Sequence, residues 1–86
     1  MSNIEILTLS VNSLTSLESI QYCKNLCELY IRNNKIENIE EIYYLKKLKN
    51  LKILWLADNQ CAEDTNYRYT VLRNLPTLHK LDNSSI

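Results

Sequence analysis

One pattern of apolar residues recurs three times along the chain, and this recurrence restricts the folds that the chain can adopt. Counted from Ile4, Leu26 and Leu51, each segment has aliphatic residues at its first, fourth and sixth positions, asparagine at its ninth and an apolar residue at its eleventh. The matching sets are Ile4, Leu7, Leu9, Asn12 and Leu14; Leu26, Leu29, Ile31, Asn34 and Ile36; and Leu51, Leu54, Leu56, Asn59 and Cys61. This agreement indicates tandem repeats of 22, 25 and 27 residues.

The spacing within each repeat predicts its local structure. Residues at the fourth to sixth positions form a short strand, in which the fourth and sixth side chains point to the core and the fifth points away. The asparagines at position nine lie where the chain turns, and their amides can pair with backbone groups that would otherwise lack partners. The chain is therefore predicted to be an α/β leucine-rich-repeat solenoid with short parallel β-strands on its concave face. We expect a single domain whose repeats cover residues 4–25, 26–50 and 51–77.

The segments between the strands predict helices on the convex side. Their aliphatic residues recur at spacings of three, which is typical of short 3₁₀ or α-helical turns. The second repeat should have the longest such helix, at residues 40–49. The residues that carry this spacing are Leu17 and Ile20 in the first repeat and Ile39, Ile42, Leu45 and Leu48 in the second.

The last segment predicts a C-terminal cap, which a solenoid needs because its final coil would otherwise expose core residues to water. Asp64 or Thr65 can begin a helix over about residues 64–75, and Pro76 ends it. A terminal strand over residues 78–82 should follow. The apolar face of the cap helix comprises Val71, Leu72 and Leu75.

The outward strand positions should gather on the concave face. Trp, Tyr and Arg are enriched in binding hot spots, and Tyr30, Arg32 and Trp55 occupy these positions. The alternative is cross-strand aromatic packing that only stiffens the sheet. Lys80 and Asp82 should extend the third- and fifth-position columns. The predicted partner-binding residues are Ile6, Thr8, Glu28, Tyr30, Arg32, Ile53, Trp55 and Lys80.

Composition argues against several other functions. The chain has no glycine, so it lacks loops that cradle phosphates, and its formal net charge of zero argues against nucleic acid as a partner. Cys23, Cys27 and His79 do not supply four zinc ligands, and His79 has no nucleophile in a recognisable context. We therefore expect no enzymatic activity, no metal and no cofactor. The number of cysteines is odd and no signal peptide precedes them, which indicates a reducing compartment in which the thiols are free. No apolar run is long enough to cross a membrane.

The stretch LKKLKNLK, residues 45–52, alternates lysine with leucine. Its lysines can meet an acidic partner, or they can form an ordinary solvated helix face. They are too few to support binding to RNA. The residues concerned are Lys46, Lys47, Lys49 and Lys52.

The run YRYTVLRNLPTLHKLD, residues 67–82, resembles the C-terminal cap of a cytoplasmic and nuclear branch of leucine-rich-repeat proteins. Together with LTLSVNSL, LCELYIRNNKI and LWLADNQ, it resembles the cilia- and flagella-associated leucine-rich-repeat proteins over roughly residues 3–83. The resemblance implies a structural role in the cap for Tyr67 and Arg68, beside Leu72, Leu75 and Pro76. Asp82 should accept hydrogen bonds that hold the final turn.

The resemblance also implies a function. It points to a protein-binding adaptor in the cytoplasm at the base of the cilium or flagellum, with a NIMA-related kinase or a ciliary cytoskeletal component as partner. The alternatives are a regulatory subunit of a phosphatase or kinase, a splicing-complex component, and a structural fragment whose partner site lies elsewhere.

Members of that family have another repeat and an N-terminal cap before the segment that matches Asn3, and a long C-terminal extension that ends in a helical oligomerisation motif. We therefore expect this chain to be a fragment or a shortened relative. Its first coil should be open on one side, with an unpaired strand edge beside exposed aliphatic residues. Self-association through the first repeat is the expected consequence.

Overall fold

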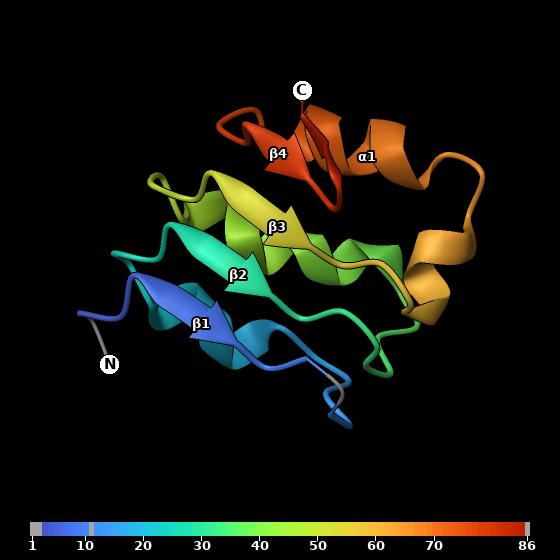
Figure 1. The fold of residues 1–86 in the computed structure, drawn as a ribbon, viewed down its shortest axis with the longest axis horizontal. Helices are drawn as coiled ribbons and strands as arrows, with labels where there is room; N and C mark the ends of the chain where they lie inside the picture. Colours follow the sequence, from blue (N-terminus) through green and yellow to red (C-terminus); the bar gives the residue numbers. More distant parts are fainter. Residues whose placement is uncertain (1–2, 11, 86) are drawn as a thin grey trace.

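Figure 1 shows a curved sheet with coiled segments along one side of it, in a computed structural model that describes residues 3–10 and 12–85. Residue 11, in the first predicted repeat, lies outside the described residues. The strands follow one another across the sheet in chain order. The first four strands are parallel, and the fifth runs antiparallel to the fourth. The strands are β1 (Ile6–Thr8), β2 (Glu28–Tyr30), β3 (Ile53–Trp55), β4 (Lys80–Leu81) and β5 (Ser84–Ser85).

The strand register follows the repeat alignment. Leu7, Leu29, Leu54 and Leu81 occupy one row across the sheet, at the fourth position of each repeat. Leu29, Leu54 and Leu81 are fully buried in the core. Residues on either side of this row point outward, as alternation along a strand requires. The predicted leucine-rich-repeat architecture is confirmed.

The convex side consists mainly of 3₁₀-helices. They are η1 (Glu18–Tyr22), η2 (Ile39–Lys47) and η3 (Gln60–Glu63), and the α-helix α1 (Tyr67–Asn74) follows them. A 3₁₀-helix has three residues per turn, so a spacing of three places side chains on one face. Ile42 and Leu45 are accordingly buried, and Leu48 continues the stripe beyond the end of η2. The second repeat has the longest of these helices, as its sequence predicts.

The first coil is less well covered than the coils that follow. Leu7, Leu9 and Leu14 are partly buried and pack against the core, whereas their counterparts in the next two repeats are fully or almost fully buried. Within the described residues, no strand pairs with the outer edge of β1.

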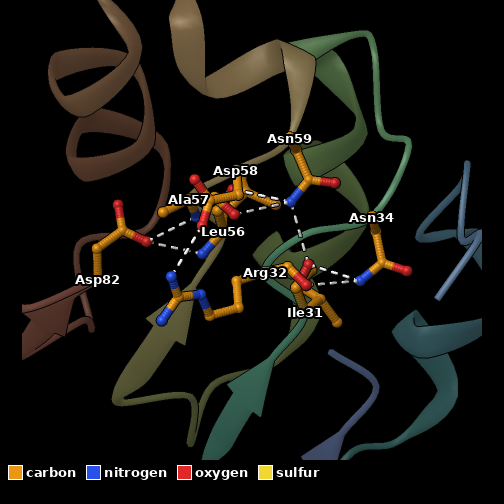
Figure 2. A network of polar contacts seen from close by, with 8 residues as sticks. All are labelled: Ile31, Arg32, Asn34, Leu56, Ala57, Asp58, Asn59 and Asp82. Atoms are coloured by element: carbon orange, nitrogen blue, oxygen red, sulfur yellow. Dashed lines mark hydrogen bonds and ion pairs between the residues drawn. The ribbon is translucent and has the colours of Figure 1, made fainter. Parts of the chain in front are cut away.

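Two buried asparagines join successive coils (Figure 2). The Asn34 amide nitrogen donates to the carbonyls of Leu9 and Ile31, at 2.9 and 2.8 Å, and its oxygen accepts the N–H of Leu14 at 3.0 Å. Asn59 repeats this arrangement one coil later. Its nitrogen donates to the Ile31 carbonyl at 3.1 Å. Each amide thus closes its own turn and also pairs with backbone groups of the preceding coil.

The turns require backbone conformations that glycine usually supplies. Asn33 and Asp58 have φ of 59° and 62°, and Asp82 has φ of 55°. Asparagine and aspartate tolerate the left-handed region better than other non-glycine residues, because their short side chains hydrogen-bond locally. A chain without glycine can therefore still form these turns.

The cap helix begins later than the sequence indicates. The predicted start was Asp64 or Thr65, whereas α1 begins at Tyr67. The reason is that η3 already winds residues 60–63, and Asp64 then adopts an extended conformation, with ψ of 136°, that breaks the helical path. Asp64 instead stabilises the connection, because its carboxylate accepts the N–H of Asn66 at 2.7 Å. The terminal strand β4 is likewise shorter than the predicted range 78–82.

Asp82 links the cap to the last full coil. Its carboxylate accepts the N–H groups of Leu56 and Ala57, at 2.8 and 2.9 Å, and the Tyr67 hydroxyl donates to it at 2.8 Å. Burial, together with the hydrogen bond to Asp82 and the negative charge of that residue, raises the pKa of Tyr67 well above its ordinary value. Tyr67 packs among the core residues, whereas Arg68 is exposed.

We predict that Asn59→Ala lowers the free energy of unfolding by at least about 2 kcal/mol, since several buried backbone groups would lose their partner. Asn12→Ala is the matched control, because the Asn12 side chain is exposed and donates only to carbonyls of its own turn. That change should cost about 0.5 kcal/mol or less. Urea denaturation followed by circular dichroism measures both, and equal costs would contradict the bridging role of Asn59.

We predict that Tyr67→Phe lowers the free energy of unfolding by about 1–3 kcal/mol near neutral pH, because Asp82 loses a donor. The pKa of Tyr67 is raised in the folded state, so its contribution is fully present below its unfolded pKa of about 10 and is lost as the pH rises above that value. The difference between the two proteins should therefore shrink above about pH 10.

Denaturation curves from pH 7 to 11 test this prediction. Tyr69→Phe serves as the control, because the Tyr69 side chain is 64% exposed. A difference between wild type and Tyr67→Phe that stays constant across the range would show that the pKa of Tyr67 is not raised in the folded state.

Candidate functional site

The outward side chains of the strands gather on the concave face of the sheet. The register aligns Ile6, Glu28, Ile53 and Lys80 in one column. Thr8, Tyr30 and Trp55 form the next column. The parallel pairing therefore brings all these residues of the predicted set onto one surface. Ile6 is 59% exposed and so adds apolar area to this surface.

An aromatic pair lies at the centre of this surface. The ring centroids of Tyr30 and Trp55 are 6.1 Å apart, with the ring planes inclined by 58°. Both side chains are half-buried, so part of each ring remains open to a partner. The Tyr30 hydroxyl donates to the Glu28 carboxylate at 2.6 Å. This hydrogen bond, with burial and the charge of Glu28 as smaller causes, raises the pKa of Tyr30.

Arg32 completes the cluster from the turn that follows β2. Its guanidinium lies 5.4 Å from the centre of the Trp55 ring, within the range of a cation–π contact. The same group donates to the Asp58 carboxylate at 2.8 Å (Figure 2). Both partners are about half exposed, so the ion pair adds little stability by itself. Its main effect is to hold the guanidinium over the tryptophan.

Asp58 is a site residue that the sequence analysis missed. It lies in the turn between β3 and η3, in the left-handed conformation described above. The sequence did contain a signal for a turn here, because Asn33 and Asp58 both occupy position eight of their repeats. Only the three-dimensional structure shows that the turn directs its carboxylate to Arg32 of the preceding coil.

Asp82 does not extend the fifth-position column. The chain turns at this residue, and its carboxylate points to the backbone of Leu56 and Ala57 instead of the concave surface (Figure 2). The sequence alignment could not show this, because the final repeat is cut short by the turn into β5. Asp82 therefore belongs to the cap and not to the concave surface.

The other reactive side chains lie elsewhere in the fold. Cys23 and Cys61 are buried, Cys27 is half-buried, and all three are free thiols. Burial is the main cause that raises the pKa of Cys61 to about 11. His79 is exposed. Among the described side chains, no group of three or more His, Cys, Asp or Glu residues is arranged to hold a metal ion.

No helix within residues 3–10 and 12–85 combines the length and hydrophobicity that crossing a membrane requires.

The concave surface offers two aromatic rings, a guanidinium and nearby carboxylates on short paired strands. Aromatic residues and arginine dominate the binding energy of protein interfaces, and rigid presentation lowers the entropy lost on binding. This chemistry suits recognition of a protein segment.

Comparison with known proteins identifies the repeats and two similar proteins. A family model described as leucine-rich repeats in two copies matches residues 2–44 and 24–69. Cilia- and flagella-associated protein 410 of Mus musculus is 50% identical over 88 residues, which cover 100% of this chain and 35% of that protein. The Homo sapiens protein of the same name is 49% identical, with coverage of 100% and 34%. The chain thus spans about a third of the length of these relatives.

Solved structures agree on the fold. The Drosophila melanogaster SNF/U2A′ complex contains a chain that superposes with a TM-score of 0.88 at 22% identity, over 99% of this chain and 50% of that one. At this identity the likeness concerns the fold alone. Because the repeat model matches most of the sequence and the register of the sheet follows the same repeats, this chain belongs to the leucine-rich-repeat family.

Proposed function

We propose that this chain is a non-catalytic adaptor module that binds a segment of a partner protein on its concave face. The observation that carries the proposal is the cluster formed by Tyr30, Trp55 and Arg32 on neighbouring coils. The rings are partly open to solvent although the chain has a large aliphatic core available to it. A tryptophan that served only the fold would gain more from full burial.

The side chains around this cluster suit a mixed apolar and polar partner. Ile6 and Ile53 extend the apolar area along the adjacent column. Glu28, Lys80 and Asp58 place charges of both signs at its margins, where they contribute mainly to orientation and association rate. A partner segment with one or more bulky apolar side chains and flanking charged groups would complement this surface.

Cellular context comes from the two relatives, whose names associate them with cilia and flagella. We place the proposed adaptor in the cytoplasm at the base of the cilium or flagellum. A NIMA-related kinase or a ciliary cytoskeletal component is the proposed partner. The structural neighbour U2A′ was solved in a complex with SNF, which supports a fold of this type as a platform for another protein.

We predict that Trp55→Ala and Tyr30→Ala each weaken binding of the partner by at least about 2 kcal/mol, or about 30-fold. Proteins retained from an extract of ciliated cells by the immobilised wild-type chain, and lost with both variants, would be identified by mass spectrometry. Their affinity would then be measured with purified components.

Leu54→Ala separates binding from folding in the same experiment. Leu54 lies between Ile53 and Trp55 on β3 and is fully buried, so truncating it should cost about 2–5 kcal/mol of stability. Trp55→Ala should cost clearly less. If both changes destabilise the chain equally, Trp55 is a core residue and the concave site is wrong.

We further propose that the chain self-associates through its first repeat at high concentration. The partly buried Leu7, Leu9 and Leu14 lie beside the outer edge of β1, with which no strand of the described residues pairs, and burial of apolar surface contributes roughly 25 cal/mol per Å². We predict a concentration-dependent dimer in sedimentation velocity that a folded Leu7→Lys variant abolishes and Tyr30→Ala preserves. The reverse pattern would assign the contact to the concave face.

A further inference from the structure

A second exposed surface lies on the convex side, where η2 faces α1. It is a shallow hollow of about 430 Å³. Two aromatic rings, a guanidinium, a hydroxyl and an amide line it. The lining residues are Tyr43, Tyr69, Thr70, Arg73 and Asn74.

The geometry of η2 determines which of its residues face α1. Because η2 has three residues per turn, Ile42 and Leu45 share its buried face. Its other residues form two columns that point away from the core. One column contains Glu41, whose carboxylate accepts the Leu17 N–H at 2.9 Å, so this column faces the first repeat. The other contains Tyr43 and Lys46, and Tyr43 lines the hollow beside α1.

The aromatic rings at this hollow are not part of the core. Tyr43 is 49% exposed and Tyr69 is 64% exposed. The Lys46 ammonium lies over the Tyr43 ring, 5.6 Å from its centre. An apolar side chain of a partner can therefore pack against tyrosine rings that the fold itself leaves open.

Glu40 lies three residues before Tyr43 in the same column of η2, and two basic residues stand beside the hollow. Lys46 and Arg73 flank it, and the Lys49 ammonium lies 3.5 Å from the Lys46 carbonyl. None of the lining residues is acidic. Within the described part of the chain, the one ion pair joins Arg32 and Asp58 on the opposite face, so these cations have no carboxylate partner.

We propose that this hollow, the η2–α1 groove, binds an acidic peptide segment of another protein. A leucine or phenylalanine of the segment would pack between Tyr43 and Tyr69, and its carboxylates would pair with Lys46 and Arg73. Arg73 lies in the last turn of α1, and its side chain is exposed.

A peptide complements the groove better than a nucleic acid does. Nucleic-acid affinity depends on many phosphate contacts from an extended basic surface, and the formal net charge of this chain is zero. The basic residues here are few and flank an aromatic hollow, which favours a partner with both carboxylates and an apolar side chain. Because the groove lies on the opposite side from Trp55, the module would hold two protein segments at once.

Fluorescence anisotropy with the full chain tests the proposal. The probe is a fluorescein-labelled peptide with a leucine–phenylalanine pair between two runs of glutamate. Tyr69→Ala and Arg73→Gln should each weaken its binding by about fivefold or more. Arg68→Gln is the matched control, because Arg68 is an exposed arginine on the same helix. This control and Trp55→Ala should leave the affinity within about twofold of wild type.

Several outcomes would overturn the proposal. An equal effect of Arg68→Gln and Arg73→Gln would indicate non-specific attraction of charge. Equal binding of a peptide with serines in place of the apolar pair would show that the tyrosine rings take no part. Tighter binding of single-stranded RNA would make the groove a nucleic-acid site, and absence of peptide binding would dismiss it. Loss of binding in Trp55→Ala alone would assign the peptide to the concave face, so this test is separate from that of the adaptor function.

Discussion

The asparagine amides that join neighbouring coils hold this solenoid together. After each strand the chain turns, and the backbone groups of this turn are buried where water cannot reach them. They therefore need partners within the protein. The carbonyl oxygen of Ile31 accepts one hydrogen bond from Asn34 of its own coil and one from Asn59 of the next (Figure 2). A single backbone group therefore connects two coils. This interaction fixes the register that places leucine above leucine in the core.

Both candidate surfaces follow from that register. On the concave side it aligns Tyr30 with Trp55 and carries Arg32 to a carboxylate of the next coil. On the convex side it sets η2 against α1, which leaves two tyrosines exposed beside the basic residues Lys46 and Arg73. One set of stacked coils thus presents two surfaces of different character, one with charges of both signs around a tryptophan and the other aromatic and basic.

The end of the solenoid uses another residue type for the same purpose. At Asp82 a carboxylate takes over the bridging role of the asparagine amide, with two backbone N–H groups and a tyrosine hydroxyl as partners. A carboxylate only accepts hydrogen bonds, so it suits a position that faces donors alone. The hydroxyl of the buried Tyr67 is one of these donors.

The spacing of apolar residues was enough to predict the repeat, the first three strands to within one residue and the residues of the concave columns. Spacings of two and three fix which side chains face inward, and asparagine at a constant position marks each turn. Tertiary structure decided the rest, because it depends on contacts between distant residues. The pairing of Arg32 with Asp58 spans two coils. The late start of α1 depends on η3, and the inward turn of Asp82 depends on donors from the preceding coil. The groove beside Tyr43 exists only where two helices from separate repeats meet.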